Sequence, residues 1–164
     1  MAALLKGSHP QTVDDRGRLA IPFKLLEPLR ELAGAKEGED VEVCVGISDR
    51  GCLAVFPKPL AEETLGNVEG SAKVRQDFFN LLASTCNYLD DQVLDKQNRF
   101  RVSSLYSEEM GLTGEVVVMG SGWYLEVVSK AQWREILAKS LSSRNDQSAK
   151  LKEYMYPEAS AAGK

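Results

Sequence analysis

Two short segments of this chain pair an aspartate with an arginine four positions later. The first is Asp14-Asp15-Arg16-Gly17-Arg18 and the second is Asp95-Lys96-Gln97-Asn98-Arg99. A planar guanidinium on a turn can make a bidentate contact with guanine O6 and N7, or clamp a phosphate. The aspartate can accept backbone N–H groups of the turn or brace the arginine before binding. The spacing therefore favours a DNA-contacting surface with Arg18 and Arg99 as its leading residues.

Three further cations accompany these pairs. Arg16 and Lys96 lie inside the segments, and Arg101 follows the second one. We expect all three to contact phosphates, which gives affinity that falls with salt and carries little sequence information. The alternative for a single Asp–Arg pair is a weak surface ion pair worth about 0–1 kcal/mol. The duplication favours the binding interpretation, with these candidate contact residues: Asp14, Arg16, Arg18, Asp95, Lys96, Arg99 and Arg101.

An internal repeat surrounds the two segments. Gln11 to Pro22 resembles Gln92 to Ser103, and the aspartate and arginine both recur after 81 residues. A valine-rich part follows each copy, in the same order of features. These parts are Val41 to Gly46 and Cys52 to Phe56 in the first copy, and Glu115 to Gly120 and Tyr124 to Val128 in the second.

Each copy is predicted to form a short strand, a turn, a second short strand, a helical stretch, a β-hairpin and a closing helix. Gly17 and Asn98 hold the matching place in the two turns, and both residue types tolerate a positive φ. Phe23 to Leu32 has apolar residues at helical spacing. Ser103 to Met110 is its counterpart, with Ser103 or Ser104 as N-cap.

The predicted fold class is α+β and rich in β-structure. One copy alone would expose strand edges and an incomplete apolar face, so the two tandem pseudo-symmetric repeats should pack together as a small β-barrel core with helices. The expected divisions are a first repeat at residues 7–60, a mostly helical connector at 61–87 and a second repeat at 88–138. A polar C-terminal tail at 139–164 is expected to be largely frayed. The connector's expected apolar side consists of Val74, Phe78, Leu81, Leu82 and Tyr88.

The composition limits the class of protein. The chain has 164 residues, a formal net charge of −4 and no long apolar run, so no membrane partner is expected and a cytoplasmic location is predicted. The net negative charge opposes binding to nucleic acid. The charge is unevenly distributed along the chain, however, because residues 95–101 carry three cations and one acid, so one face of the protein can still be positive. The three cysteines are widely spaced and the single histidine, His9, has no ligand set near it. We therefore expect reduced cysteines, no metal and no cofactor.

At these residues the sequence resembles the MraZ family of bacterial proteins, within the SpoVT/AbrB-like, swapped-hairpin barrel superfamily. The resemblance covers about residues 7–137, and Asp14 to Pro22 fulfils every position of the family's first motif. It implies a nucleoid-associated transcriptional regulator that forms homo-oligomeric rings. Such a ring would bind direct repeats of double-stranded DNA in the promoter of the division and cell-wall gene cluster. The second copy departs from the pattern at Asn98, Arg101 and Ser103.

Three rival functions remain to be compared. An enzyme is disfavoured, because the chain has one histidine, no nucleophile elbow and no glycine-rich phosphate loop. An antitoxin-like member of the same superfamily would also bind DNA, although the internal duplication speaks against that type. A purely structural ring that has lost DNA binding is left open by the changes in the second copy.

Overall fold

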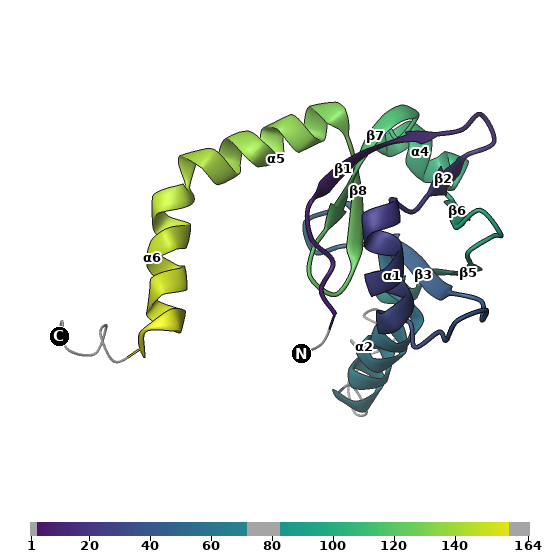
Figure 1. Cartoon of the computed structure of the whole chain (residues 1–164), viewed down its shortest axis with the longest axis horizontal. Helices are drawn as coiled ribbons and strands as arrows, with labels where there is room; N and C mark the ends of the chain where they lie inside the picture. Colours follow the sequence, from purple (N-terminus) through teal and green to yellow (C-terminus); the bar gives the residue numbers. More distant parts are fainter. Residues whose placement is uncertain (1–2, 72–82, 158–164) are drawn as a thin grey trace. The chain divides into compact units, whose positions relative to one another are not determined.

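The computed structural model describes residues 3–71 and 83–157. The first copy contains β1 (Ser8–Val13), β2 (Arg18–Ala20), α1 (Phe23–Leu32), β3 (Glu42–Ile47), β4 (Leu53–Pro57) and α2 (Lys58–Ser71). The second contains β5 (Asp90–Val93), β6 (Arg99–Arg101), α4 (Ser104–Met110), β7 (Gly114–Gly120), β8 (Leu125–Ser129) and α5 (Lys130–Ser142). The predicted order of elements is confirmed in both copies, and the fold class is α+β with a large antiparallel sheet (Figure 1).

The strands of the two copies alternate within one sheet. Its order is β1-β7-β8-β4-β3-β5, so each hairpin receives the first strand of the other copy at its outer edge. The two hairpins meet through β4 and β8. The short strands β2 and β6 form a separate ribbon. In the described part of the chain the strands thus pair as an open sheet and a ribbon, rather than as one continuous barrel ladder.

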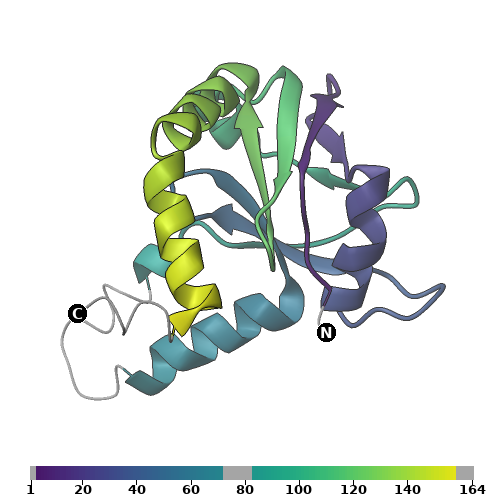
Figure 2. The same ribbon diagram turned by 60° about the vertical axis from the view of Figure 1, so that its left-hand side comes forward.

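The helices follow the local sequence signals. Leu25 and Leu29 of α1 are fully buried against the core, and each such burial stabilises the fold by about 1.5–3 kcal/mol. Both views show α1 beside the sheet (Figure 1, Figure 2). Ser103 is the N-cap of α4, and its hydroxyl accepts the N–H of Leu105. The core includes residues of both copies, such as Val43 and Val118, so neither copy buries its apolar face alone.

A buried carboxylate joins the two hairpins. Glu126 of β8 has no exposed surface, and it accepts hydrogen bonds from Ser48 at 2.7 Å, from Ser121 at 2.6 Å and from the guanidinium of Arg50. Burial raises the pKa of Glu126, but the hydrogen bonds from Arg50 and the two serines outweigh it and hold the pKa below its ordinary value. The side chain is therefore ionised at neutral pH and depends on its partners.

The C-terminal region corrects one expectation. Residues 139–155 are helical rather than frayed, because α5 continues to Ser142 and α6 follows at Arg144–Met155. Most residues of α6 are good helix formers, which can form a helix even when none of its side chains is buried: Arg144, Gln147, Ala149, Lys150, Leu151, Lys152, Glu153 and Met155. The chain from Lys130 forms a unit of its own. Along the described residues, no helix has the length and hydrophobicity needed to cross a bilayer.

The described parts of the connector are largely helical. Helix α2 continues to Ser71, and residues 83–86 are also helical. Four of the expected apolar residues, Val74, Phe78, Leu81 and Leu82, lie outside the described residues, and Tyr88 is half exposed.

Candidate nucleic-acid interface

The aspartate of each loop organises the loop backbone. Oδ1 of Asp14 accepts the N–H of Arg16 at 3.0 Å and that of Arg18 at 2.8 Å. Oδ1 of Asp95 accepts the N–H of Gln97 and that of Arg99, both at 2.9 Å. In each loop, the backbone N–H of the aspartate also donates to the carbonyl of the arginine at 3.0 Å. The two loops are therefore closed by the same set of hydrogen bonds.

The second oxygen of each aspartate braces the arginine side chain. Nε of Arg18 donates to Oδ2 of Asp14 at 2.7 Å, and Nε of Arg99 donates to Oδ2 of Asp95 at 2.8 Å. Both guanidinium side chains are about a quarter exposed, at 29% and 25%. Charge-assisted bonds of this kind order a long side chain before it meets a ligand.

Both aspartates are held in their ionised form. The backbone N–H of Arg18 is the main cause that lowers the pKa of Asp14, with the Arg18 guanidinium contributing as well. Partial burial raises the pKa of Asp95, but the backbone and side-chain hydrogen bonds from Arg99 outweigh it and leave the pKa lowered. Each loop therefore carries a fixed negative charge that anchors its arginine at neutral pH.

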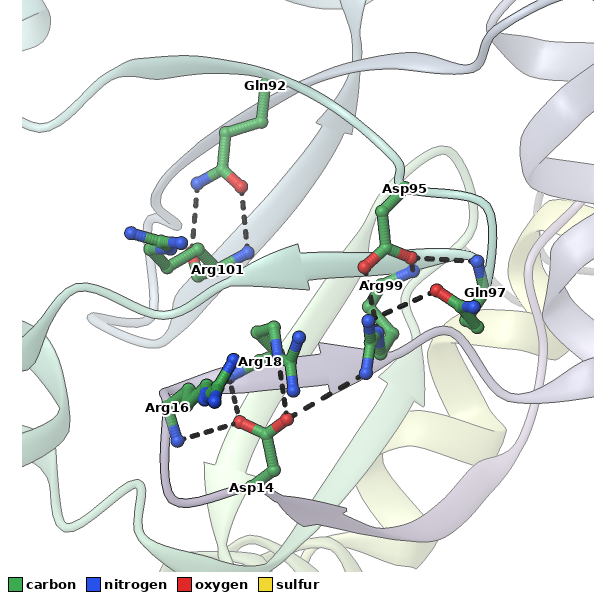
Figure 3. A network of polar contacts seen from close by, with 8 residues as sticks. All are labelled: Asp14, Arg16, Arg18, Gln92, Asp95, Gln97, Arg99 and Arg101. Carbon is green, nitrogen blue, oxygen red and sulfur yellow. Dashed lines mark hydrogen bonds and ion pairs between the residues drawn. The ribbon is translucent and has the colours of Figure 1, made fainter.

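The ribbon of β2 and β6 brings the two loops together. Arg18 lies opposite Arg101 and Ala20 opposite Arg99 in the antiparallel register. Reciprocal backbone hydrogen bonds cross the ribbon, from Ile21 N–H to the Asn98 carbonyl at 2.9 Å and from Val102 N–H to the Gly17 carbonyl at 2.7 Å. Residues 81 positions apart in the sequence thus form one surface (Figure 3).

An ion pair also connects the loops directly. Nη1 of Arg99 lies 3.9 Å from Oδ2 of Asp14, the same oxygen that Arg18 contacts (Figure 3). The charge of Asp14 therefore acts on both arginines, whereas Asp95 serves Arg99 in its own loop. The two loops are coupled through this aspartate.

All seven residues proposed from the sequence lie on these loops and on the ribbon between them. Arg16, Lys96 and Arg101 are exposed, as contact with a phosphate backbone requires. An open hollow of about 900 Å³ lies beside the first loop, and its lining includes Arg16, Arg101, Ser103 and Ser104. The surface is thus accessible to an extended ligand.

Three glutamines take part in the site although sequence reasoning did not select them. Gln92 accepts the N–H of Arg101 at 2.8 Å and donates to its carbonyl at 2.9 Å, and Gln11 donates to the carbonyl of Ala20 at 3.1 Å. Gln97 accepts a hydrogen bond from Nη2 of Arg99 at 3.1 Å. The recurrence of Gln11 and Gln92 before each aspartate was a usable signal, but nothing in the sequence distinguished Gln97 from any exposed loop residue.

The turn residues of the two loops adopt the backbone conformation predicted for them. Gly17 has φ of 75° and Asn98 has φ of 58°. A Cβ atom on Gly17 would also lie 2.9 Å from the carbonyl oxygen of Val102. The position tolerates no side chain without movement of the ribbon.

Replacement of Gly17 with alanine is expected to lower the free energy of unfolding by about 1–2 kcal/mol, because an L-residue is strained in the left-handed region. DNA affinity should fall too, since the loop geometry shifts. Urea unfolding followed by circular dichroism measures the first effect. Asn98→Gly is the matched control, because it keeps the same φ without strain, and equal stability of Gly17→Ala and wild type would contradict the interpretation of the turn.

Acidic, histidine and cysteine side chains are the other groups of the described residues that could do chemistry. No cluster of three or more histidine, cysteine or acidic residues suited to a metal occurs in the part of the chain that the structure describes. The cysteines are thiols rather than disulfides, with Cys44 and Cys52 buried and Cys86 exposed. Burial, aided by Asp91, raises the pKa of the Cys44 thiol to about 11, so it is protonated and unreactive.

Comparison with known proteins identifies relatives over most of the chain. Residues 90–153 match a family described as "MraZ protein, putative antitoxin-like". A protein of Corynebacterium jeikeium named Transcriptional regulator MraZ is 33% identical over 133 residues, which cover 81% of this chain and 86% of the relative. Proteins of the same name from Heliobacterium modesticaldum and Mycolicibacterium vanbaalenii are 29% and 31% identical, over 92% and 86% of this chain and 99% and 94% of their own lengths.

Proposed function

This chain belongs to the MraZ family of transcriptional regulators, and from that premise we propose that it binds double-stranded DNA in a sequence-specific manner through its two Asp–Arg loops. The observation that carries the proposal is the shared ribbon, which presents Arg18 and Arg99 from one surface with their Nε atoms already engaged by aspartate. A braced guanidinium loses less conformational freedom when it binds a base edge or a phosphate.

The contact residues divide into two roles. Arg18 makes a bidentate contact with guanine in the major groove, since its terminal amino groups have no acceptor among the described residues. Arg16, Lys96 and Arg101 bind phosphates, because they are exposed and belong to the two loops and the ribbon that carries Arg18 and Arg99. Asp14 and Asp95 hold the arginines in position rather than contacting DNA themselves.

Several subunits act together in the proposed complex. One subunit of net charge −4 offers only a few cations to DNA, so a single loop pair binds weakly. A homo-oligomeric ring that engages successive direct repeats gains effective concentration without new contacts. Repeats spaced by about 10 base pairs, one helical turn, would present the same groove face to neighbouring subunits. From the family resemblance, we expect the ring to bind DNA in the promoter of the division and cell-wall gene cluster.

Gel-shift titration with DNA that carries one to four direct repeats tests the proposal. Each added repeat is expected to raise affinity by at least roughly tenfold until the ring is saturated, because later contacts are intramolecular. Raising the salt from about 50 to 200 mM should weaken binding steeply, through release of counterions from the contacted phosphates.

Two control DNAs accompany the titration. One has scrambled repeats, and the other has repeats moved apart by about half a helical turn, roughly 5 base pairs. Both should bind at the level of a single repeat or below. Equal affinity for scrambled and intact repeats would refute sequence-specific recognition, and no binding at any salt would favour the purely structural ring.

A further inference from the structure

The two arginines differ in what surrounds their terminal amino groups. Among the described residues, Arg18 has a side-chain partner only at Nε, which donates to Asp14. Arg99 has a partner at all three nitrogens: Asp95 at Nε, Gln97 at Nη2 and Asp14 at Nη1. Figure 3 shows the Arg99 guanidinium between these three side chains. Nη1 and Nη2 of Arg18 therefore have no side-chain partner among the described residues, whereas both of these atoms in Arg99 have one.

This difference matters for base recognition. A bidentate contact with guanine uses two N–H groups of one guanidinium at once. In both arginines Nε already donates to an aspartate, so a bidentate contact with guanine must use Nη1 and Nη2. For Arg99 a guanine must compete with the Gln97 oxygen at 3.1 Å and with the ion pair to Asp14 at 3.9 Å. A single phosphate oxygen does not need both amino groups.

One difference between the copies accounts for the partner at Nη2. Gln97 occupies the place that Arg16 holds in the first loop, 81 residues earlier. A glutamine side chain has a carbonyl oxygen that accepts a hydrogen bond, whereas an arginine has donors only. The first loop therefore cannot restrain its own arginine in this way, even though the backbones of the two loops are closed alike.

We infer that Gln97 is a specificity-determining residue, which restrains Arg99 so that each subunit reads guanine through Arg18 and uses Arg99 for phosphate. The inference rests on the proposed function and names the residue that makes the two loops unequal. Gln97 acts as a positioning residue, because its contact is with Arg99 rather than with DNA.

The test is selection from a library of double-stranded DNA in which one repeat is randomised, performed with wild type and with Gln97→Ala. Wild type should select one strongly preferred guanine per repeat, and Arg18→Ala should lose it. Gln97→Ala should keep that guanine and gain a second one, preferred by roughly 5- to 150-fold over other bases, which is the range for one bidentate contact. The double variant Gln97→Ala with Arg99→Ala should lose only the gained guanine.

Two further variants separate positioning from a general effect on the loop. Gln97→Glu retains an acceptor for Arg99 and should keep the wild-type base preferences, although overall affinity falls with the added negative charge. Arg16→Gln places an acceptor in the first loop and should weaken the guanine preference that depends on Arg18. Because both side chains are exposed, these variants should fold, which thermal unfolding confirms.

The outcomes are distinct. Unchanged base preferences in both Gln97→Ala and Arg16→Gln would overturn the inference. Loss in Gln97→Ala of a guanine that Arg99→Ala also loses would overturn it as well, since Gln97 would then orient Arg99 toward a base. Absence of any selected sequence with wild type would instead count against the proposed function itself.

Discussion

Arg18→Ala is expected to lower the affinity for promoter repeats by roughly 5- to 150-fold for each engaged subunit, while the oligomer stays intact. The range corresponds to about 1–3 kcal/mol for the loss of one bidentate contact with guanine. Arg18 is the residue of choice because its Nε is braced by Asp14 at 2.7 Å and its side chain remains 29% exposed. Gel-shift titration measures the affinity, and size-exclusion chromatography measures the oligomer.

Three control variants refine this result. Arg18→Lys keeps the charge but not the planar fork, so it should retain salt-dependent binding and lose discrimination between sequences. Arg99→Ala should lower the affinity by a smaller or equal factor, because Asp14 and Gln97 already bind the Nη atoms of the Arg99 guanidinium. Full repeat-specific affinity in the Arg18→Ala, Arg99→Ala double variant would exclude the two loops as the recognition surface.

Arg50→Ala is expected to lower the free energy of unfolding by about 3 kcal/mol at neutral pH. Removing one partner of a buried ion pair typically costs about 3–5 kcal/mol, because the remaining charge is left in a medium that solvates it poorly. The lower end applies here, since the Arg50 side chain is 51% exposed and Ser48 and Ser121 still donate to Glu126. Urea unfolding measured by circular dichroism gives the value.

The pH dependence of this loss has a definite sign. The pKa of Glu126 is lowered from its ordinary value of 4.5 in the folded protein, so the carboxylate stabilises the fold above that pH. This contribution disappears as the pH falls through the folded-state pKa. The difference in stability between wild type and Arg50→Ala should therefore be largest near neutral pH and should shrink below pH 4.5.

A second substitution provides the control. Adding Glu126→Gln to Arg50→Ala removes the unpaired charge, and the amide can still bond to both serines. The double variant should therefore be more stable than Arg50→Ala at neutral pH. If Arg50→Ala matched wild type, or if the difference did not change with pH, the ion pair would contribute nothing to the fold.

Local sequence patterns were sufficient to predict the elements and the loops. The positive φ at Gly17 and Asn98, the helical spacing of α1 and the Ser103 cap depend on neighbouring residues, and short-range interactions determine them. The dual role of each aspartate is also local, because its partners lie two and four positions away. The repeat then indicated that the two halves should pack together.

The structure also corrects the expectation of a frayed tail at residues 139–155. Its polar composition is typical of a disordered tail, but an exposed helix such as α6 can form from good helix formers without burying any side chain. Composition alone does not separate the two outcomes, since both kinds of segment are polar.

The contacts of Glu126 could not be predicted from local sequence. One acid within the apolar run Tyr124 to Val128 was a visible irregularity, yet its partners Ser48 and Arg50 lie 78 and 76 residues away. Only the pairing of β4 with β8 brings these side chains together. A buried charge is stabilised by contacts that a sequence pattern does not contain.

By itself, the sequence determined that two Asp–Arg loops exist, how each one turns and which residues they expose. Only the tertiary structure decided that β2 pairs with β6 and that Asp14 reaches Arg99 as well as Arg18. The physical reason is the range of the interactions. Turns, caps and the Gln97–Arg99 contact join atoms a few residues apart, whereas the Asp14–Arg99 ion pair forms only because the fold brings together two loops that lie 81 residues apart in the sequence.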